Sequence, residues 1–338
     1  MGAGKATVLD RLISEEDGVA VLDGGLASEL ESRGADLTDA LWSAKCLIEN
    51  PGLIRQVHLD YFRAGADIVT SCSYQATFEG FQKKGLGEKQ AEELMRLSVK
   101  LACEARDQAN KESQSSGSPA LRQKKRLVAA SLGCYGASLS NGAEYSGDYG
   151  GVSTEDMMEF HRRRLRVMSR SGADVLAFET VPRLQEAEAI ARLLDEDSDE
   201  DCVPAWVCFS CKDERHVSHG ETLADCVRAL ESCKRVAAVG INCTWPRFIQ
   251  GLVTEARKVT SKPIVVYPNL GESWDAERKE WVLSTGATDD DFVSMVPVWK
   301  DAGARIIGGC CRTTPRTIQC IALALKRSGQ CFSASHGA

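Results

Sequence analysis

Eight short runs of apolar, often β-branched residues recur along the whole chain, and most of them precede a stretch with helical periodicity. Near-continuous apolar strands separated by helices are typical of a parallel sheet that is covered on both faces. Eight such units in 338 residues predict a closed (β/α)8 barrel, the TIM barrel, with an open doubly wound sheet as the alternative. The expected strands span residues 19–23, 66–74, 126–133, 173–180, 205–211, 237–243, 263–269 and 304–311.

Helix boundaries are marked by capping motifs and by glycines. Asn50 followed by Pro51 predicts the start of a helix, and Gly65 predicts its end. Ser153 with Asp156 has the spacing of a capping box, and the four arginines of the helix that follows are expected away from its buried face. In both cases a strand begins directly after the helix, which is the repeating unit of a barrel.

Because these units run through the whole length, residues 1–338 are expected to form one barrel domain. The polar stretch 111–125 and the acidic run 195–201 are expected to be solvated surface inserts or loops. Residues 141–151, rich in glycine and tyrosine, follow the third strand, where barrel enzymes place active-site loops. The sequence leaves open whether this segment is a lid or an ordinary packed loop.

The charge balance argues for small-molecule partners. The chain has 48 acidic and 41 basic side chains, a formal net charge of −7 and a pI near 5.5, which gives no electrostatic reason to bind nucleic acid or an anionic membrane. No stretch is apolar for long enough to cross a bilayer and no secretion signal is found, so a cytoplasmic location is expected. The 14 cysteines are then expected to be thiols rather than disulfides. No feature sets the oligomeric state, and a monomer is the starting expectation.

Cysteines close two of the expected strands. Cys243 ends the sixth, and Cys310 with Cys311 ends the eighth. Since strand ends of a barrel converge on one mouth, these three thiolates could surround a metal ion and leave a fourth tetrahedral position free. The glycines before Cys310 would allow a close approach of backbone and metal. Buried cysteines meeting by coincidence, or a redox-active vicinal disulfide, are the alternatives that spacing alone leaves open.

Other chemistry-bearing residues carry weaker signals. Cys208 and Cys211 have the spacing of a redox pair, but within a strand they point to opposite faces, which favours core packing. Asp23 and Glu179 each end an expected strand and would face the mouth, where either could hold a substrate ammonium. Asp23 could equally brace a turn, whereas an unpaired buried carboxylate at Glu179 is costly and therefore harder to explain structurally.

Taken together, the motifs resemble those of the homocysteine S-methyltransferase family, in particular the plant-type enzymes that use S-methylmethionine, and the resemblance covers nearly the whole chain. The matching segments are Asp-Gly-Gly-Leu-Ala at 23–27, Leu-Trp-Ser-Ala at 41–44, Ser-Tyr-Gln-Ala-Thr at 73–77, Gly-Ile-Asn-Cys at 240–243, Tyr-Pro-Asn at 267–269 and Gly-Gly-Cys-Cys at 308–311.

The resemblance implies a (β/α)8 barrel in which Cys243, Cys310 and Cys311 bind Zn2+. It also implies that Asp23 and Glu179 receive the amino group of homocysteine. Four further residues are implied to line the pocket, namely Tyr74, Gln75, Asn242 and Asn269. Betaine-dependent relatives differ after the second strand, so the segment 73–77 favours a sulfonium donor, S-methylmethionine or S-adenosylmethionine.

The implied reaction is attack of the homocysteine thiolate on the donor methyl group, with a neutral thioether leaving, so no general acid is required. A cationic donor favours an aromatic cage, and the candidates are Tyr74, Tyr145, Tyr149 and Trp245. Trp245 could also tune the choice of donor or acceptor. Two alternatives remain, a selenocysteine Se-methyltransferase and a non-catalytic zinc-holding or redox-sensing barrel.

Overall fold

A computed structural model describes residues 6–115, 124–196, 202–271, 273–275, 280–282 and 288–330. Its main sheet contains eight parallel strands in the order β1-β10-β7-β6-β5-β4-β3-β2. These are β1 (Ala20–Val21), β2 (Ile68–Thr70), β3 (Leu127–Gly133), β4 (Val175–Val181), β5 (Ala205–Phe209), β6 (Val236–Asn242), β7 (Ile264–Tyr267) and β10 (Ala304–Ile307). A parallel bridge between Leu22 and Ile68 joins the first strand to the second and closes the sheet. The predicted (β/α)8 barrel is confirmed, and each expected strand is present.

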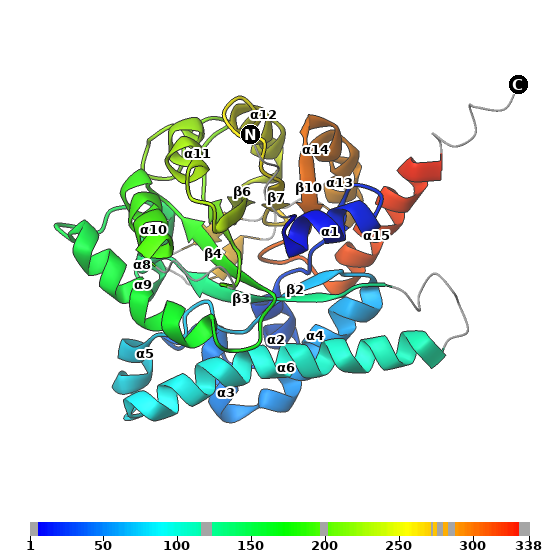
Figure 1. Cartoon of the computed structure of the whole chain (residues 1–338). Helices are drawn as coiled ribbons and strands as arrows, with labels where there is room; N and C mark the ends of the chain where they lie inside the picture. The colour runs from blue at the N-terminus through cyan, green and yellow to red at the C-terminus, as the bar shows by residue number, and fades with distance from the viewer. Residues whose placement is uncertain are drawn as a thin grey trace, which may run out of the picture.

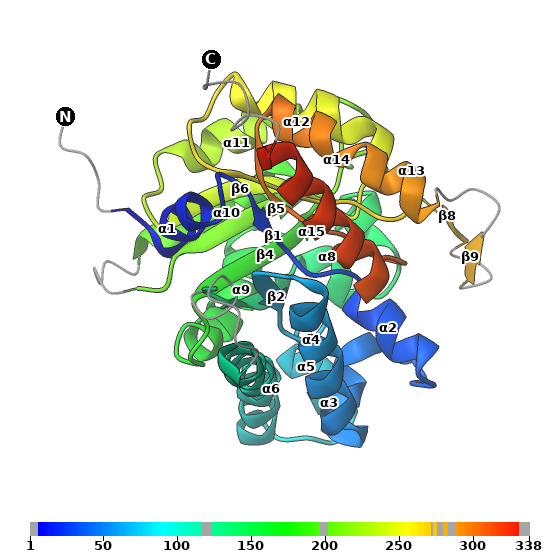
Figure 2. The ribbon, with the colours of Figure 1, turned by 90° about the vertical axis from the view of Figure 1, so that its right-hand side faces the viewer.

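Helices surround the strands, as Figures 1 and 2 show. The longer ones are α4 (Pro51–Ala64), α6 (Glu88–Ser115), α9 (Thr154–Met168), α10 (Leu184–Glu196), α11 (Leu223–Glu231), α12 (Ile249–Arg257) and α15 (Pro315–Gln330). The shorter helical segments are α1 (Val8–Glu15), α2 (Leu26–Ser32), η1 (Trp42–Lys45), α3 (Cys46–Glu49), α5 (Phe78–Lys83), α8 (Tyr135–Ser138), η2 (Ala143–Tyr145), η3 (Pro246–Phe248), α13 (Asp289–Ser294) and α14 (Val296–Ala302). Strands β8 (Ser273–Asp275) and β9 (Glu280–Val282) form a separate antiparallel pair.

The predicted helix boundaries hold. The Asn50 side chain accepts a hydrogen bond from the Leu53 amide at the start of α4, and Gly65 ends that helix with a φ of 113°. Ser153 and Asp156 form a reciprocal capping box at the start of α9. These local signals fix where α4 begins and ends and where α9 begins. The end of α4 in turn sets where β2 can begin.

The interior of the barrel and the layer between strands and helices are two separate apolar clusters. Trp206 and Tyr267 lie in the inner cluster, whereas Phe178 and Phe209 lie in the outer layer. Cys208 faces the inner cluster and Cys211 the outer one, and both are buried. The prediction that these two cysteines are core residues is confirmed.

The described parts of the two predicted surface inserts are largely helical. Residues 111–115 form the last turn of α6, and the Ser113 hydroxyl in this turn accepts a hydrogen bond from the buried Arg126. Residues 195 and 196 end α10. The prediction of loops was wrong for these residues because helix packing extends the helices into polar sequence. The remainder of both stretches, residues 116–123 and 197–201, lies outside the described residues. Residues 124–125 precede β3 and belong to neither a helix nor a strand.

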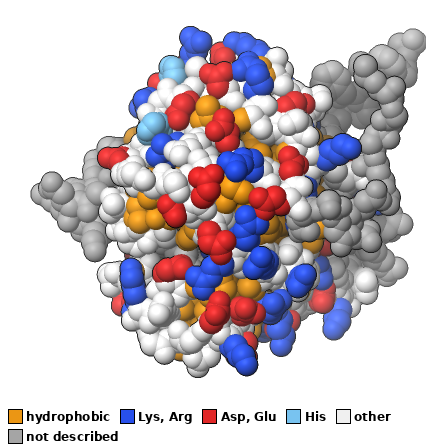
Figure 3. All heavy atoms as spheres, turned by 60° about the vertical axis from the view of Figure 1, so that its left-hand side comes forward, with side chains coloured by type: hydrophobic (Ala, Val, Ile, Leu, Met, Phe, Trp, Pro, Cys, Tyr) orange, Lys and Arg blue, Asp and Glu red, His pale blue; other side chains and the backbone are white. Residues whose placement is uncertain are grey.

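The surface agrees with the charge balance of the sequence. On the face drawn in Figure 3, acidic and basic side chains are interspersed and form no broad patch of one sign. Within the described ranges, no helix is both long enough and apolar enough to cross a membrane.

Candidate active site

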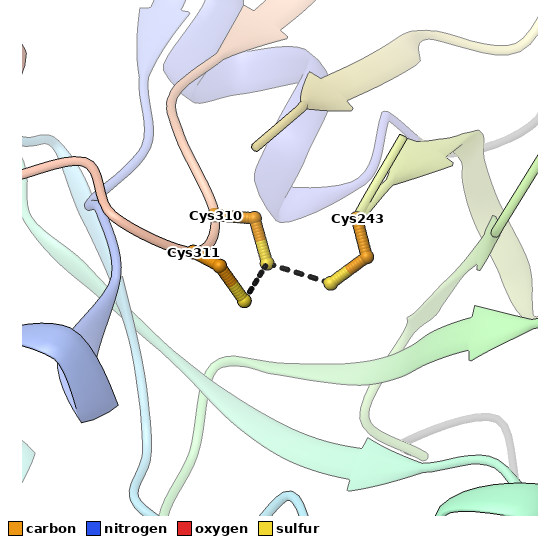
Figure 4. A group of neighbouring side chains, drawn as sticks. All are labelled: Cys243, Cys310 and Cys311. Atoms are coloured by element: carbon orange, nitrogen blue, oxygen red, sulfur yellow. Dashed lines mark hydrogen bonds between the residues drawn. The ribbon is translucent and has the colours of Figure 1, made fainter. Parts of the chain in front are cut away.

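The three cysteines that end β6 and β10 converge at the carboxyl-terminal mouth of the barrel. Cys243 follows β6, and Cys310 with Cys311 follows β10, and their side chains point toward one another in Figure 4. The sulfur atoms of Cys243 and Cys310 are 2.8 Å apart, and those of Cys310 and Cys311 are 4.0 Å apart. All three sulfurs lie within 4.8 Å of one another, which makes the group a candidate metal site. The convergence predicted from the sequence is therefore present.

The backbone around the cysteines is tightly constrained. Cys243 has a φ of 47°, in the left-handed region that a residue with a Cβ rarely adopts. A Cβ on Gly308 would lie 2.6 Å from the carbonyl oxygen of Asp23, and one on Gly25 would lie 2.6 Å from that of Cys310. The glycines before Cys310 do allow a close approach, as predicted, but the group that approaches Gly308 is the backbone at the end of β1.

The sulfurs of the cluster alter one another's acidity. Hydrogen bonding from Cys310, and then from Cys311, holds the pKa of the Cys243 thiol well below its usual range. The pKa values of Cys310 and Cys311 are raised in turn, chiefly by their contacts with Cys243.

Asp23 and Glu179 lie beside the cluster as two buried carboxyl groups. Asp23 accepts hydrogen bonds from the Thr70 amide, at 2.8 Å, and from the Thr70 hydroxyl, at 3.2 Å. Glu179 accepts a hydrogen bond from the hydroxyl of Ser131. Burial raises the pKa of Glu179 to about 7. Burial also raises the pKa of Asp23 well above its usual value, and the charge of Glu179 contributes to this shift. No basic side chain pairs with either group in the described part of the chain, so the pair is suited to a cation from outside.

Asn242 and Asn269 support the strand ends that carry the cysteines. The Asn242 amide oxygen accepts from the Thr180 backbone amide at 2.8 Å, and its nitrogen donates to the Thr180 hydroxyl at 2.8 Å. The Asn269 side-chain oxygen accepts from the Cys311 amide at 3.2 Å. Both residues lie at the predicted site, and their observed contacts are with the chain itself.

Tyr74 and Gln75 lie on the loop after β2. The Tyr74 ring meets Trp42 edge-on, with 6.1 Å between centroids, and the charge of Cys243 is among the causes that raise the pKa of Tyr74, after burial. The Gln75 nitrogen donates to the Ala137 carbonyl, whereas its buried oxygen has no hydrogen-bond partner among the described residues.

A buried arginine holds the Tyr74 loop in place. Arg164 of α9 donates to the carbonyl oxygens of Gly133, at 2.8 Å, and of Tyr74, at 3.3 Å. The prediction that all four arginines of α9 lie away from its buried face is wrong for Arg164, which is 1% exposed. These two carbonyl groups and the Phe160 ring, 4.9 Å away, offset the cost of burying this charge.

The loop 141–151 brings two residues to the mouth, the predicted cage candidate Tyr145 and also Glu144, which the sequence analysis did not single out. Hydrogen bonding from the Tyr145 side chain is among the causes that lower the pKa of Cys243, after those from Cys310 and Cys311, and 41% of Tyr145 is exposed. Glu144, its neighbour, has a buried carboxyl oxygen without a hydrogen-bond partner. Glu144 belongs to the segment 141–151, which the sequence analysis noted as a possible lid. No pattern in the neighbouring residues predicts that its side chain turns inward.

Two of the predicted cage aromatics have other partners. The Tyr149 hydroxyl donates to Glu186 at 2.5 Å and its ring packs on Tyr135, so Tyr149 lies in the helix layer and the cage prediction is wrong for it. One face of Trp245 is covered by the guanidinium of Arg247, 4.6 Å from the ring centroid. Tyr74 and Tyr145 are the candidates that the electrostatics place beside the cysteines.

Comparison with known proteins agrees with this geometry. The model of the homocysteine S-methyltransferase family matches residues 20–325. The chain belongs to this family. A selenocysteine Se-methyltransferase of Brassica oleracea var. italica is 53% identical, over 97% of this chain and 94% of the relative. A homocysteine S-methyltransferase 2 of Arabidopsis thaliana is also 53% identical, over 91% of this chain and 93% of the relative.

A solved member of the family has the same fold. The metallated form of the homocysteine methyltransferase MmuM from Escherichia coli superposes with a TM-score of 0.80 at 41% sequence identity. The alignment covers 93% of this chain and 99% of that protein. The resemblance and the barrel inferred from the sequence are therefore both confirmed.

Proposed function

We propose that this chain is a zinc-dependent methyltransferase that transfers a methyl group from S-methylmethionine to the thiol of L-homocysteine and so forms methionine. S-adenosylmethionine is the second donor in this proposal. The observation that carries it is the cluster of Cys243, Cys310 and Cys311 at the mouth of the barrel. Two relatives that are each 53% identical to this chain are named as methyltransferases of selenocysteine and of homocysteine, and these names support the reaction class.

The geometry of the three sulfurs fits zinc. Ligands about 2.3 Å from one zinc ion at tetrahedral angles lie about 3.8 Å apart. Sulfurs that already lie within 4.8 Å of one another reach that arrangement by small side-chain rotations. Three protein thiolates leave a fourth position for the substrate sulfur. Zinc bound there would lower the pKa of an incoming thiol, so that a thiolate forms near neutral pH.

The protein's own residues bind and orient the acceptor. In this proposal Asp23 and Glu179 receive the homocysteine ammonium, because they are buried, lie beside the cysteines and have no basic partner among the described side chains. Asn242 and Asn269 hold the backbone at Thr180 and Cys311, while Tyr74 and Gln75 line the donor side.

The methyl transfer itself requires positioning rather than proton transfer. The acceptor sulfur forms a bond to the methyl carbon as the bond from that carbon to the donor sulfur breaks. The electron pair stays on the donor sulfur, which leaves as a neutral thioether, so no general acid is needed. With S-methylmethionine each turnover yields two methionines. Holding the two sulfurs in line with the methyl group is the main contribution of the protein.

Selenocysteine is a second candidate acceptor. The observation that favours it is the 53% identity to a protein named selenocysteine Se-methyltransferase. A selenolate would enter the same three-thiolate site, since soft ligands suit such a metal centre.

Three broader features complete the proposal. We propose that residues 1–338 act as one homocysteine-binding domain, as a monomer and in the cytoplasm, with small-molecule substrates and neither nucleic acid nor membrane as a partner. The acidic charge balance supports the choice of small-molecule substrates.

The deciding experiment measures methionine formation by zinc-loaded protein from homocysteine, with S-methylmethionine, S-adenosylmethionine or betaine as the sole donor. We expect turnover with S-methylmethionine. Selenocysteine as the sole acceptor then ranks the two acceptors. No turnover with any pair, in protein shown to hold zinc, would overturn the proposal and favour a zinc-holding or redox-sensing barrel without catalysis.

A further inference from the structure

Glu144 has an acidic group at the mouth for which neither the family resemblance nor the proposed mechanism assigns a role. It lies in η2, directly before Tyr145. Its Oε2 atom is buried and has no hydrogen-bond partner in the part of the chain that the structure describes. No lysine, arginine or histidine within that part forms an ion pair with it. An acceptor in this state carries an unmet desolvation cost.

The surroundings of Glu144 favour a cation. The charge of Glu144 raises the pKa of Tyr74 and of Tyr145, after the larger effect of burial, and the charge of Cys243 raises that of Glu144. These three neighbours supply two aromatic rings and a thiolate. A carboxylate, a thiolate and aromatic rings close to one another repel an anion and attract a positive group.

The backbone that carries Glu144 is fixed in place. The Glu144 carbonyl oxygen accepts a hydrogen bond from the Ser210 hydroxyl at 2.7 Å, and that of Gly147 accepts one from Arg183 at 3.0 Å. Farther along the loop, Tyr149 is bonded to the buried Glu186. A carboxyl group held in this way is preorganised for a ligand, because little conformational entropy remains to be lost on binding.

We propose that Glu144 binds the α-ammonium group of the methyl donor. This inference rests on the proposed function and assigns the donor side of that site. An ammonium offers three N–H donors to the unpaired oxygen, whereas a sulfonium offers none. The sulfonium is better served by the faces of Tyr74 and Tyr145. Burial raises the pKa of Glu144, and an ammonium in contact reverses that shift and favours the carboxylate.

Pairing of the Glu144 carboxylate with the donor ammonium predicts a specific change in the kinetic constants when Glu144 is replaced. The donor ammonium keeps its charge throughout the reaction, so Glu144 stabilises the bound donor and the transition state equally. Loss of such uniform binding raises KM and leaves kcat unchanged. A hydrogen bond to a charged group is worth about ten- to hundredfold in binding. The acceptor KM should not move, because Asp23 and Glu179 lie on the homocysteine side.

The test compares Glu144→Gln with wild type by steady-state kinetics of the zinc-loaded enzymes. We expect the KM for S-methylmethionine to rise about ten- to hundredfold, with kcat and the homocysteine KM within about twofold of wild type. Asp148→Asn is the matched control, since it removes one charge from the same loop at an exposed residue whose side chain accepts a hydrogen bond only from the Gly150 amide in the described structure. Thermal unfolding and zinc content of both variants should match wild type.

A second arm separates the ammonium from the sulfonium. Inhibition by dimethylsulfoniopropionate, a sulfonium without an amino group, should be equally strong for wild type and Glu144→Gln. An unchanged donor KM or a rise in the homocysteine KM alone would each overturn the assignment. It would also be overturned if Glu144→Gln bound S-methylmethionine and dimethylsulfoniopropionate more weakly than wild type by the same factor. These results differ from failure of the proposed function itself, in which wild type would not turn over S-methylmethionine.

Discussion

Replacement of Glu186 by alanine should destabilise the protein and weaken the donor side of the site together. Glu186 is fully buried in α10 and accepts hydrogen bonds from three groups. These are the Tyr135 amide at 2.6 Å, the Tyr149 hydroxyl at 2.5 Å and the His161 ring nitrogen at 2.8 Å. Burial lowers the pKa of His161, so the ring is neutral and donates through the nitrogen that faces Glu186.

The magnitude follows from the number of groups left without a partner. Each buried donor that loses its acceptor costs about 1–3 kcal/mol, and three donors that share one acceptor are not additive. We therefore expect Glu186→Ala to lower the free energy of unfolding by about 3–5 kcal/mol, the range for a broken buried charge network. Tyr149 also anchors the loop of Glu144 and Tyr145, so the donor KM should rise as well.

Urea unfolding followed by circular dichroism measures the first effect, and steady-state kinetics with varied S-methylmethionine measures the second. The matched control is Glu188→Ala, an exposed glutamate two residues away on the same helix, which should stay within about 0.5 kcal/mol of wild type. A loss below about 1 kcal/mol in Glu186→Ala, comparable to the control, would refute the view that this carboxylate holds the loop.

Three further predictions concern the mouth of the barrel. Cys310→Ser should lose bound zinc, measured with a metallochromic chelator, and all methyl transfer, while its circular dichroism spectrum stays native; a fully active zinc-free variant would contradict the mechanism. Asp23→Asn and Glu179→Gln should each raise the homocysteine KM about tenfold or more through loss of a charged hydrogen bond, and unchanged kinetics in both would remove them from the amine site. Because burial raises the pKa of Glu179 from 4.5 to about 7, the native state holds this proton more tightly than the unfolded chain does; its stabilising contribution of about 3 kcal/mol is complete below pH 4.5 and is lost as the pH rises to about 7. Urea unfolding between pH 4.5 and 8 should show this loss in wild type and a flatter profile in Glu179→Gln; parallel profiles would exclude the shift.

Much of the fold was predictable because its signals are local. Apolar strand runs, the Asn50 cap, the capping box of Ser153 and the glycine that ends α4 each depend on neighbours within a few residues. The convergence of Cys243 with Cys310 and Cys311 was predictable as well, since the ends of parallel barrel strands meet at one mouth.

The direction of side chains outside the regular elements was not predictable in this way. Tyr145 and Tyr149 stand four residues apart in one loop, yet Tyr145 helps to lower the pKa of Cys243 whereas Tyr149 packs on Tyr135 and is hydrogen-bonded to Glu186. The difference is decided by Glu186, which lies 37 residues beyond Tyr149 in the sequence. Arg164 is likewise buried because two carbonyl groups distant in the sequence accept its hydrogen bonds, one at the end of β3 and one on the loop after β2.

The sequence by itself determined the barrel, the existence and order of its eight strands and the three sulfurs that could bind zinc, because periodicity and position at a strand end carry that information. Only the tertiary structure decided which carboxyl groups lack a basic partner among the described residues. Whether Glu144 is paired or free depends on every side chain that the fold brings around it, and no local pattern records those neighbours.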